Sequence, residues 1–168
     1  MLIFIRRLDT PIVSDEPLAF IVLDHEQRRR TRQRTTRSDG VSVGIALPRG
    51  TVLRPGDILA TEDDQRAQVR AAFELLSIAA TADPFILARA AYHLGNRHTA
   101  LQLGAGYLCY PHEPVLDLLC VRLGLAVSFE HRAFEPELLG HSAHDNSPEW
   151  HLSGGHHVAT STDPANRD

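Results

Sequence analysis

The sequence contains no lysine, so all 17 basic residues are arginines, and its only cysteines are Cys109 and Cys120. These two cysteines form no disulfide framework and lack the C-x-x-C spacing of thiolate sites, which favours a reducing compartment. No apolar run approaches the roughly 20 residues that a membrane span needs. Arginines follow the short apolar start Met1–Ile5 rather than precede it, so we expect no secretory signal. A cytoplasmic protein without membrane insertion is predicted.

Motifs of enzymes are missing too. The chain has no H-E-x-x-H, no G-x-S-x-G, no phosphate-binding loop and no dinucleotide fingerprint. We therefore predict that it is not an enzyme. A metal-dependent hydrolase is the less favoured alternative, because it would need an ordered site with an open coordination position and a nearby general base.

The net charge of -4 argues against a general nucleic-acid binder, although six arginines lie between Arg28 and Arg37. If this run is a strand, Arg28, Arg30, Arg32 and Arg34 share one strongly positive face. Two interpretations stay open: a surface for an acidic partner, or an edge strand that its charges protect from unwanted pairing. No aromatic residues interleave with the arginines to stack on bases, so nucleic acid is not an expected partner.

Residues 1–70 are predicted to form a small all-β domain. Their apolar runs are short and are separated by turn signals such as Asp39-Gly40 and Arg54-Pro55-Gly56-Asp57. The expected strands include Leu2 to Leu8, Ala19 to Leu23, Ser42 to Ala46 and Ile58 to Ala60.

Residues 71–137 have a different pattern, in which strands alternate with capped helices. Asp83-Pro84 is an N-cap followed by proline at the first helical position, Gly95-Asn96 is a stop signal, and a second helix runs from Pro114 to Gly124. The remaining segments are predicted strands: Phe73 to Ala79, Leu101 to Leu103, Leu108 to Tyr110 and Ala126 to His131. The order β-α-β-β-α-β is that of a ferredoxin-like domain, so the fold class is α+β.

Histidine is the unusual residue of this composition, with ten in the chain. In residues 138–168 the apolar periodicity disappears, and a disordered tail is expected there. Five of the histidines lie in this stretch: His141, His144, His151, His156 and His157. Because a polar segment gives them no core to pack into, we predict them to be metal ligands on a tail that binds and releases readily.

The interior candidates for metal binding are His93, His98 and His112. On a continuous helix His93 and His98 would point about 140° apart, so they could not chelate one ion together. Gly95 is expected to end the helix and leave His98 in a loop, while His112 stands just before the second helix. Each of them could equally be an ordinary helix-end or surface histidine, since no carboxylate partner is visible in the sequence.

The octapeptide from Ala91 to His98, AYHLGNRH, resembles a segment of the urease accessory protein E family. Similarity continues through the segments Leu47-Pro48-Arg49-Gly50 and Gly56-Asp57 upstream and Phe134-Glu135-Pro136-Glu137 downstream, so it covers about residues 1–140. The resemblance implies a nickel metallochaperone with a partner-binding N-terminal domain and a metal-binding domain through which two chains pair.

The resemblance also implies roles for single residues. His98 would meet its symmetry mate around one ion at the interface of a homodimer, and His112 matches a secondary metal-binding histidine. Urease apoprotein and the accessory GTPase are the expected partners, and Ni(II) is the expected ion, with Zn(II) and Cu(II) as further ions that imidazole binds. The alternative to delivery is a histidine-based metal buffer or storage protein.

Overall fold

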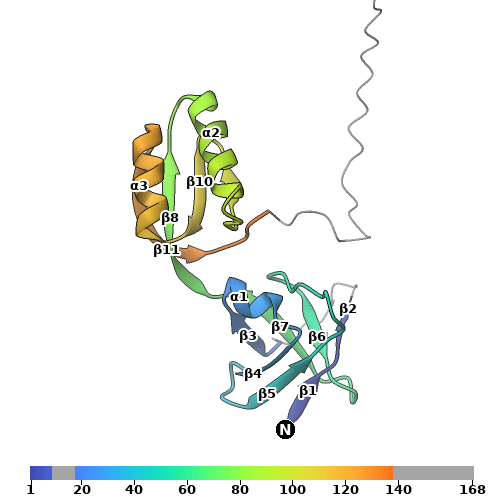
Figure 1. Cartoon of the computed structure of the whole chain (residues 1–168). Helices are drawn as coiled ribbons and strands as arrows, with labels where there is room; N and C mark the ends of the chain where they lie inside the picture. The colour runs from blue at the N-terminus through green and yellow to red at the C-terminus, as the bar shows by residue number, and fades with distance from the viewer. Residues whose placement is uncertain (9–17, 138–168) are drawn as a thin grey trace, which may run out of the picture. The chain divides into compact units, whose positions relative to one another are not determined.

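The computed structural model describes residues 1–8 and 18–137, and within them it contains three β-sheets and three helices (Figure 1). The predicted tail, residues 138–168, lies outside the described residues. In the described chain, no helix is long and apolar enough to cross a membrane. The mixed α+β composition that was predicted from the sequence is observed.

Two of the sheets come from the first part of the chain. One has the strand order β1-β5-β4 and the other β2-β6-β7-β3. Their strands are β1 (Leu2–Phe4), β2 (Arg6–Leu8), β3 (Phe20–Leu23), β4 (Arg32–Thr36), β5 (Ser42–Ala46), β6 (Ile58–Ala60) and β7 (Arg66–Ala71). β1 is parallel to β5 and β3 to β7, whereas the other pairs are antiparallel. The predicted run from Leu2 to Leu8 is divided at Ile5, where the chain passes from one sheet to the other.

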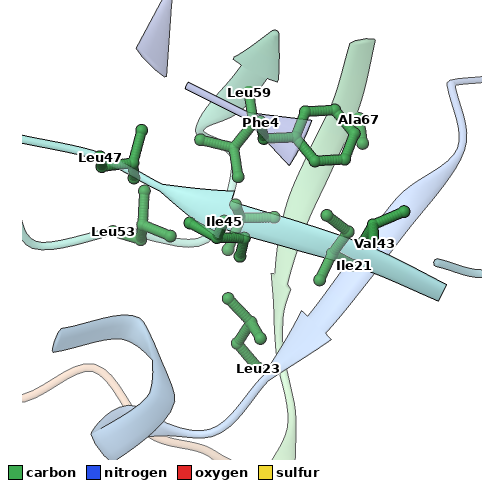
Figure 2. Close-up of a cluster of buried hydrophobic side chains, with 10 residues drawn as sticks. Phe4, Ile21, Leu23, Val43, Ile45, Leu47, Leu53, Leu59 and Ala67 are labelled. Carbon is green, nitrogen blue, oxygen red and sulfur yellow. The ribbon is translucent and has the colours of Figure 1, made fainter. Parts of the chain in front are cut away.

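A single apolar cluster fills the space between these strands (Figure 2). Side chains alternate along a strand, so Phe4 of β1 points into the cluster while its neighbour Ile3 is exposed. The buried members are Phe4, Ile21, Leu23, Val43, Ile45, Leu47, Leu53, Leu59, Ala67 and Val69. Short strands from both sheets thus share one core.

The arginine run is not one strand, so the condition under which four arginines would share one face is not met. It begins in a short helix, α1 (His25–Arg29), because Asp24 accepts a hydrogen bond from the N–H of Gln27 while the Gln27 side chain bonds back to Asp24, a capping box. Arg28 is buried and donates to the carbonyl of Phe134. Of the four arginines expected to share a face, only Arg32 and Arg34 do so, both exposed on β4.

The rest of the described chain forms the third sheet and its helices. The elements are β8 (Phe73–Ala80), α2 (Pro84–Gly95), β9 (Gln102–Gly104), β10 (Tyr107–Pro111), α3 (Pro114–Leu123) and β11 (Ala126–Ala133). The sheet is antiparallel with the order β11-β8-β10-β9, and both helices lie on one side of it (Figure 1). The predicted element order β-α-β-β-α-β is therefore observed.

Apolar residues cover both faces of this sheet. On the helical side the buried cluster contains Ala79, Ala90, Leu94, Leu108, Tyr110, Leu116, Cys120 and Leu125. A smaller cluster consists of Leu76, Cys109 and Phe134. Both helices are thus packed on the sheet, which fixes the positions of His98, just after α2, and His112, just before α3.

His25 of α1 is buried against the start of β8 and the end of β11. Its backbone N–H donates to Oε1 of Glu74 (2.8 Å), and its ring meets that of Phe134 edge to face at 5.3 Å. Among the described residues its Nε2 is buried without a hydrogen-bond partner. Burial, and then the charge of Arg28, lower the pKa of His25. The folded protein therefore favours the neutral imidazole.

The first prediction concerns helix capping. Asp83 accepts hydrogen bonds from the N–H groups of Phe85 (2.8 Å) and Ile86 (3.3 Å), whereas Glu113, at the same position of α3, makes no side-chain cap bond. Asp83→Ala should lower the free energy of unfolding by about 1 kcal/mol, and Glu113→Ala by much less. Urea unfolding of both variants measures this, and equal losses would contradict the assignment of the cap.

The second prediction concerns pH. Because the pKa of His25 is lowered on folding, the unfolded chain takes up the proton first, and the free energy of unfolding should fall as pH drops below about 6.5. His25→Phe keeps the edge-to-face contact but cannot be protonated, so its stability should fall less between pH 8 and pH 5. Urea unfolding across this range tests it. At pH 8 the imidazole is neutral in both states, so any difference there reports packing alone; parallel pH curves would contradict the prediction.

Candidate metal centre

The end of α2 sets the position of His98. The backbone N–H of His98 donates to the carbonyl of Gly95 (2.8 Å), and that of Thr99 donates to the carbonyl of Leu94 (3.3 Å). These two bonds form a Schellman motif, which places one residue past the helix in the left-handed conformation. His98 is that residue, with φ at 56°, and its side chain is exposed.

Glycine normally occupies this left-handed position, as Gly124 does at the end of α3 with φ at 97°. α2 ends at Gly95 and His98 lies in the loop beyond it, as the sequence predicted, but the residue in the left-handed conformation is His98 and not a glycine. A side chain with a Cβ is costly in this conformation, although histidine tolerates it better than most residues. Such outliers cluster at functional positions, so the imidazole of His98 is a candidate for function.

His93 lies in the last turn of α2 and is half-buried. Its ring meets Tyr92 edge to face at 5.4 Å, and its carbonyl accepts a hydrogen bond from the guanidinium of Arg97 (2.9 Å). These contacts fit the ordinary helix-end role that was left open from the sequence.

His112 stands between β10 and α3, and its ring is held from several sides. Nδ1 lies 3.0 Å from Oδ2 of Asp117 and 3.1 Å from Oγ of Ser77. The ring also packs edge to face on Phe129, with centroids 4.8 Å apart, while the backbone N–H donates to the carbonyl of Leu75. The side chain remains 30% exposed, so His112 is fixed yet reachable from solvent.

Asp117 is the residue that sequence reasoning missed. Five positions separate it from His112, and the turn between a strand and a helix brings the two together, so no helical or strand period relates them. Asp117 is 9% exposed, and its Oδ1 accepts a hydrogen bond from the hydroxyl of buried Tyr110 (3.0 Å). The available signal was an acid inside the otherwise apolar run Val115 to Leu119.

The cysteines offer no thiolate ligand. Cys109 and Cys120 are free and buried, as the absence of a disulfide framework predicted. Burial raises the pKa of both thiols, so both stay protonated. Cys120 instead lies 3.3 Å from the hydroxyl of Tyr110 in the buried network beside Asp117. The exposed candidate ligands of this part of the chain are therefore nitrogen atoms of histidine.

The described residues contain no group of three or more His, Cys, Asp and Glu side chains that could hold a metal ion. His98 and His112 are consequently not joined in one complete ligand set within residues 1–8 and 18–137. The other predicted ligands, His141, His144, His151, His156 and His157, lie outside the described residues. Of the predicted ligands, the described chain therefore shows two separate imidazoles: His98, placed by backbone conformation, and His112, placed by a carboxylate.

Comparison with known families accounts for nearly the whole chain. Residues 4–72 match the model for the N-terminal domain of the UreE urease accessory protein, and residues 73–163 match that for its C-terminal domain. The chain belongs to the UreE family. The resemblance carried by the octapeptide from Ala91 to His98 is thereby confirmed.

Individual relatives agree with this assignment. The chain is 45% identical over 138 residues to a urease accessory protein UreE of Escherichia coli O157:H7, covering 82% of this chain and 88% of the relative. It is 45% identical to one of Pseudomonas putida strain W619, covering 82% and 84%, and 42% identical to one of Citrobacter koseri, covering 82% and 89%. Members of the UreE family are accessory proteins rather than enzymes, which confirms that prediction.

A third prediction separates the backbone of His98 from its ring. His98→Gly and His98→Ala both remove the imidazole, but only alanine keeps the cost of a Cβ in the left-handed conformation. His98→Gly should be more stable than His98→Ala by about 1 kcal/mol, measured by urea unfolding. The matched comparison is Gly124→Ala at the end of α3, which should lose a similar amount relative to the wild type. Equal stability of the two His98 variants would show that the left-handed turn is not maintained.

Proposed function

We propose that this chain is a nickel-binding metallochaperone that delivers Ni(II) for assembly of the urease active site. Its family is that of urease accessory proteins, which gives it a role in urease maturation rather than in catalysis. The observation that carries the nickel proposal is His98, an exposed imidazole held at a left-handed position after α2. Imidazole is a suitable ligand for nickel, and an exposed ring can both accept an ion and give it up.

The metal site of this proposal belongs to a homodimer. One chain contributes one His98, and the described residues offer no set of three donors, so a second chain is the natural source of the next ligand. Large apolar side chains on the outward faces of α2 and α3 support pairing through residues 71–137. Those with more than half of their surface exposed include Phe85, Tyr92, Val115 and Val121.

Further ligands complete the proposed shell. Two His98 imidazoles leave coordination positions open, which His141, His144, His151, His156 and His157 of residues 138–168 would fill. His112 is a separate, secondary ligand in this scheme. Weak and exchangeable ligation of this kind suits transfer, whereas a closed, rigid set of four protein ligands suits permanent structural binding.

The two halves of residues 1–137 divide the work in this proposal. Residues 71–137 form the metal-binding and dimerisation domain, and their element order together with the strand order β11-β8-β10-β9 supports a ferredoxin-like assignment. Residues 1–70 bind the partners, which are urease apoprotein and the accessory GTPase. The exposed side chains of Arg32 and Arg34 on β4 suit an acidic partner surface.

The recipient rather than the ligands makes the carrier specific for nickel. Affinity of nitrogen and oxygen sites rises from nickel to copper and falls at zinc, so Cu(II) and Zn(II) would bind the same imidazoles. Delivery of Ni(II) follows from the ion supplied in the cytoplasm and from the docked urease proteins.

The fourth prediction tests the carrier directly by calorimetric nickel titration, with the mass of the complex followed in parallel. His98→Asn is the variant to use, because asparagine also tolerates the left-handed backbone and so removes only the imidazole. It should abolish the tight site, which fills at about one ion per dimer. A chain ending after Glu137 should keep pairing and lose only weaker binding or part of the affinity.

Two results would decide against this function. If His98→Asn binds nickel as the wild type does, the histidine ends the helix and has no part in the metal site. If several ions bind to the full chain and none to a chain ending after Glu137, the protein is better described as a histidine-based buffer. His93→Gln is the matched control: it removes a nearby imidazole that has helix-end contacts of its own, and it should leave the titration unchanged.

A further inference from the structure

The buried carboxylate of Asp117 decides which nitrogen of His112 carries the proton. A carboxylate oxygen only accepts hydrogen bonds, so the ring nitrogen that lies 3.0 Å from Oδ2 must be a donor. Ser77 Oγ, at 3.1 Å, can donate or accept and therefore adapts to either form of the ring. In neutral His112 the proton is then on Nδ1, which leaves the lone pair of Nε2 free.

Asp117 is itself held in place by its other oxygen. Oδ1 accepts from the hydroxyl of Tyr110 at 3.0 Å, and Tyr110 is fully buried between the sheet and α3. A carboxylate this far from solvent needs both hydrogen bonds to offset the loss of water. The backbone N–H of Asp117 donates to the carbonyl of Glu113 in the first turn of α3, so the main chain is fixed as well.

We propose that Asp117 is a positioning residue for metal binding, which fixes His112 in the tautomer and orientation that present Nε2 to a divalent ion. The arrangement of carboxylate, histidine and open ring nitrogen is the one that supports histidine ligands in metalloproteins. The inference rests on the proposed function for the role of His112 as a ligand. The tautomer, in contrast, is a property of the metal-free protein.

Asp117 could instead serve the helix alone, since an acid in the first turn interacts favourably with the helix dipole. That role concerns stability and requires neither a ring partner nor a particular tautomer. A role in the helix dipole alone does not explain why the ring of His112 also packs on Phe129, which sets the plane of the ring. The two roles therefore differ in what Asp117→Asn does to the ring.

The fifth prediction uses the full chain with ¹⁵N-labelled histidine and long-range ¹H–¹⁵N correlation spectra of the metal-free protein. The ring of His112 is identified by its contact with Phe129. In the wild type its protonated nitrogen should be Nδ1. In Asp117→Asn the amide oxygen keeps the bond from Tyr110, so the NH₂ group faces Nδ1 and donates to it, and the proton should move to Nε2.

Nickel affinity of the His112 site should fall about 10- to 100-fold in Asp117→Asn, the usual effect of removing the partner of a ligating histidine. Glu113→Gln is the matched control, because it removes one negative charge beside His112 from an exposed position. It should leave the tautomer unchanged and alter the affinity by less than about fivefold. Tyr110→Phe removes the hydroxyl that bonds Oδ1 and Cys120 Sγ but keeps the carboxylate beside His112, so it should give a smaller loss than Asp117→Asn.

Several results would overturn the inference. A wild-type His112 protonated on Nε2 would do so without any variant or metal. So would a loss of nickel affinity in His112→Asn with no loss in Asp117→Asn, which would leave the proposed function intact. Unchanged nickel binding in His112→Asn would instead remove His112 from the proposed ligands, and the inference with it. An equal loss of nickel affinity in Glu113→Gln and Asp117→Asn would show that only the negative charge near His112 matters, and not the contact of Asp117 with the ring.

Discussion

The left-handed turn at His98 is the constraint on which the position of this candidate metal ligand depends. Two backbone hydrogen bonds close α2 there, and they need a residue with positive φ at that one position. The chain places histidine where α3, ending in the same motif, places glycine. Backbone geometry and side-chain position are thereby coupled: the turn that stops the helix also holds an imidazole in the solvent, without any side-chain partner being required to orient it.

Much of the fold could be predicted from the sequence, because its signals are local. Asp83-Pro84 begins a helix for reasons contained in those two residues, and Gly124 ends the next one. The arginine run shows where local reasoning stops: a single strand was left only as a condition, and the capping box of Asp24 and Gln27 with the burial of Arg28 places the start of the run in a short helix. That burial depends on a carbonyl at Phe134, more than a hundred residues away, which no local pattern reveals.

The site was predictable in the same uneven way. His98 and His112 could be selected as candidates from their residue type and from the resemblance to the family. The left-handed backbone of His98 and the carboxylate beside His112 could not be predicted. The end of α2 at Gly95 was predicted, but the left-handed conformation of His98 was not, because a histidine in that conformation is uncommon. Asp117 was overlooked because its partnership with His112 arises only after β10 and α3 pack together, which also buries the hydroxyl of Tyr110.

The two imidazoles differ in how they are supported, and this difference bears on transfer. The carboxylate of Asp117 on Nδ1 fixes the plane of the His112 ring, so this ring presents Nε2 in one geometry. His98 has only its backbone to restrain it, and its ring can turn about χ1 and χ2 without breaking a hydrogen bond that the described structure contains. The ring of His98 can therefore change orientation at low cost, whereas the ring of His112 is more rigidly oriented. Under the proposed function, His112, whose ring is fixed by a buried carboxylate, suits retention of the ion. His98, which is fixed only by its main chain, suits release of the ion.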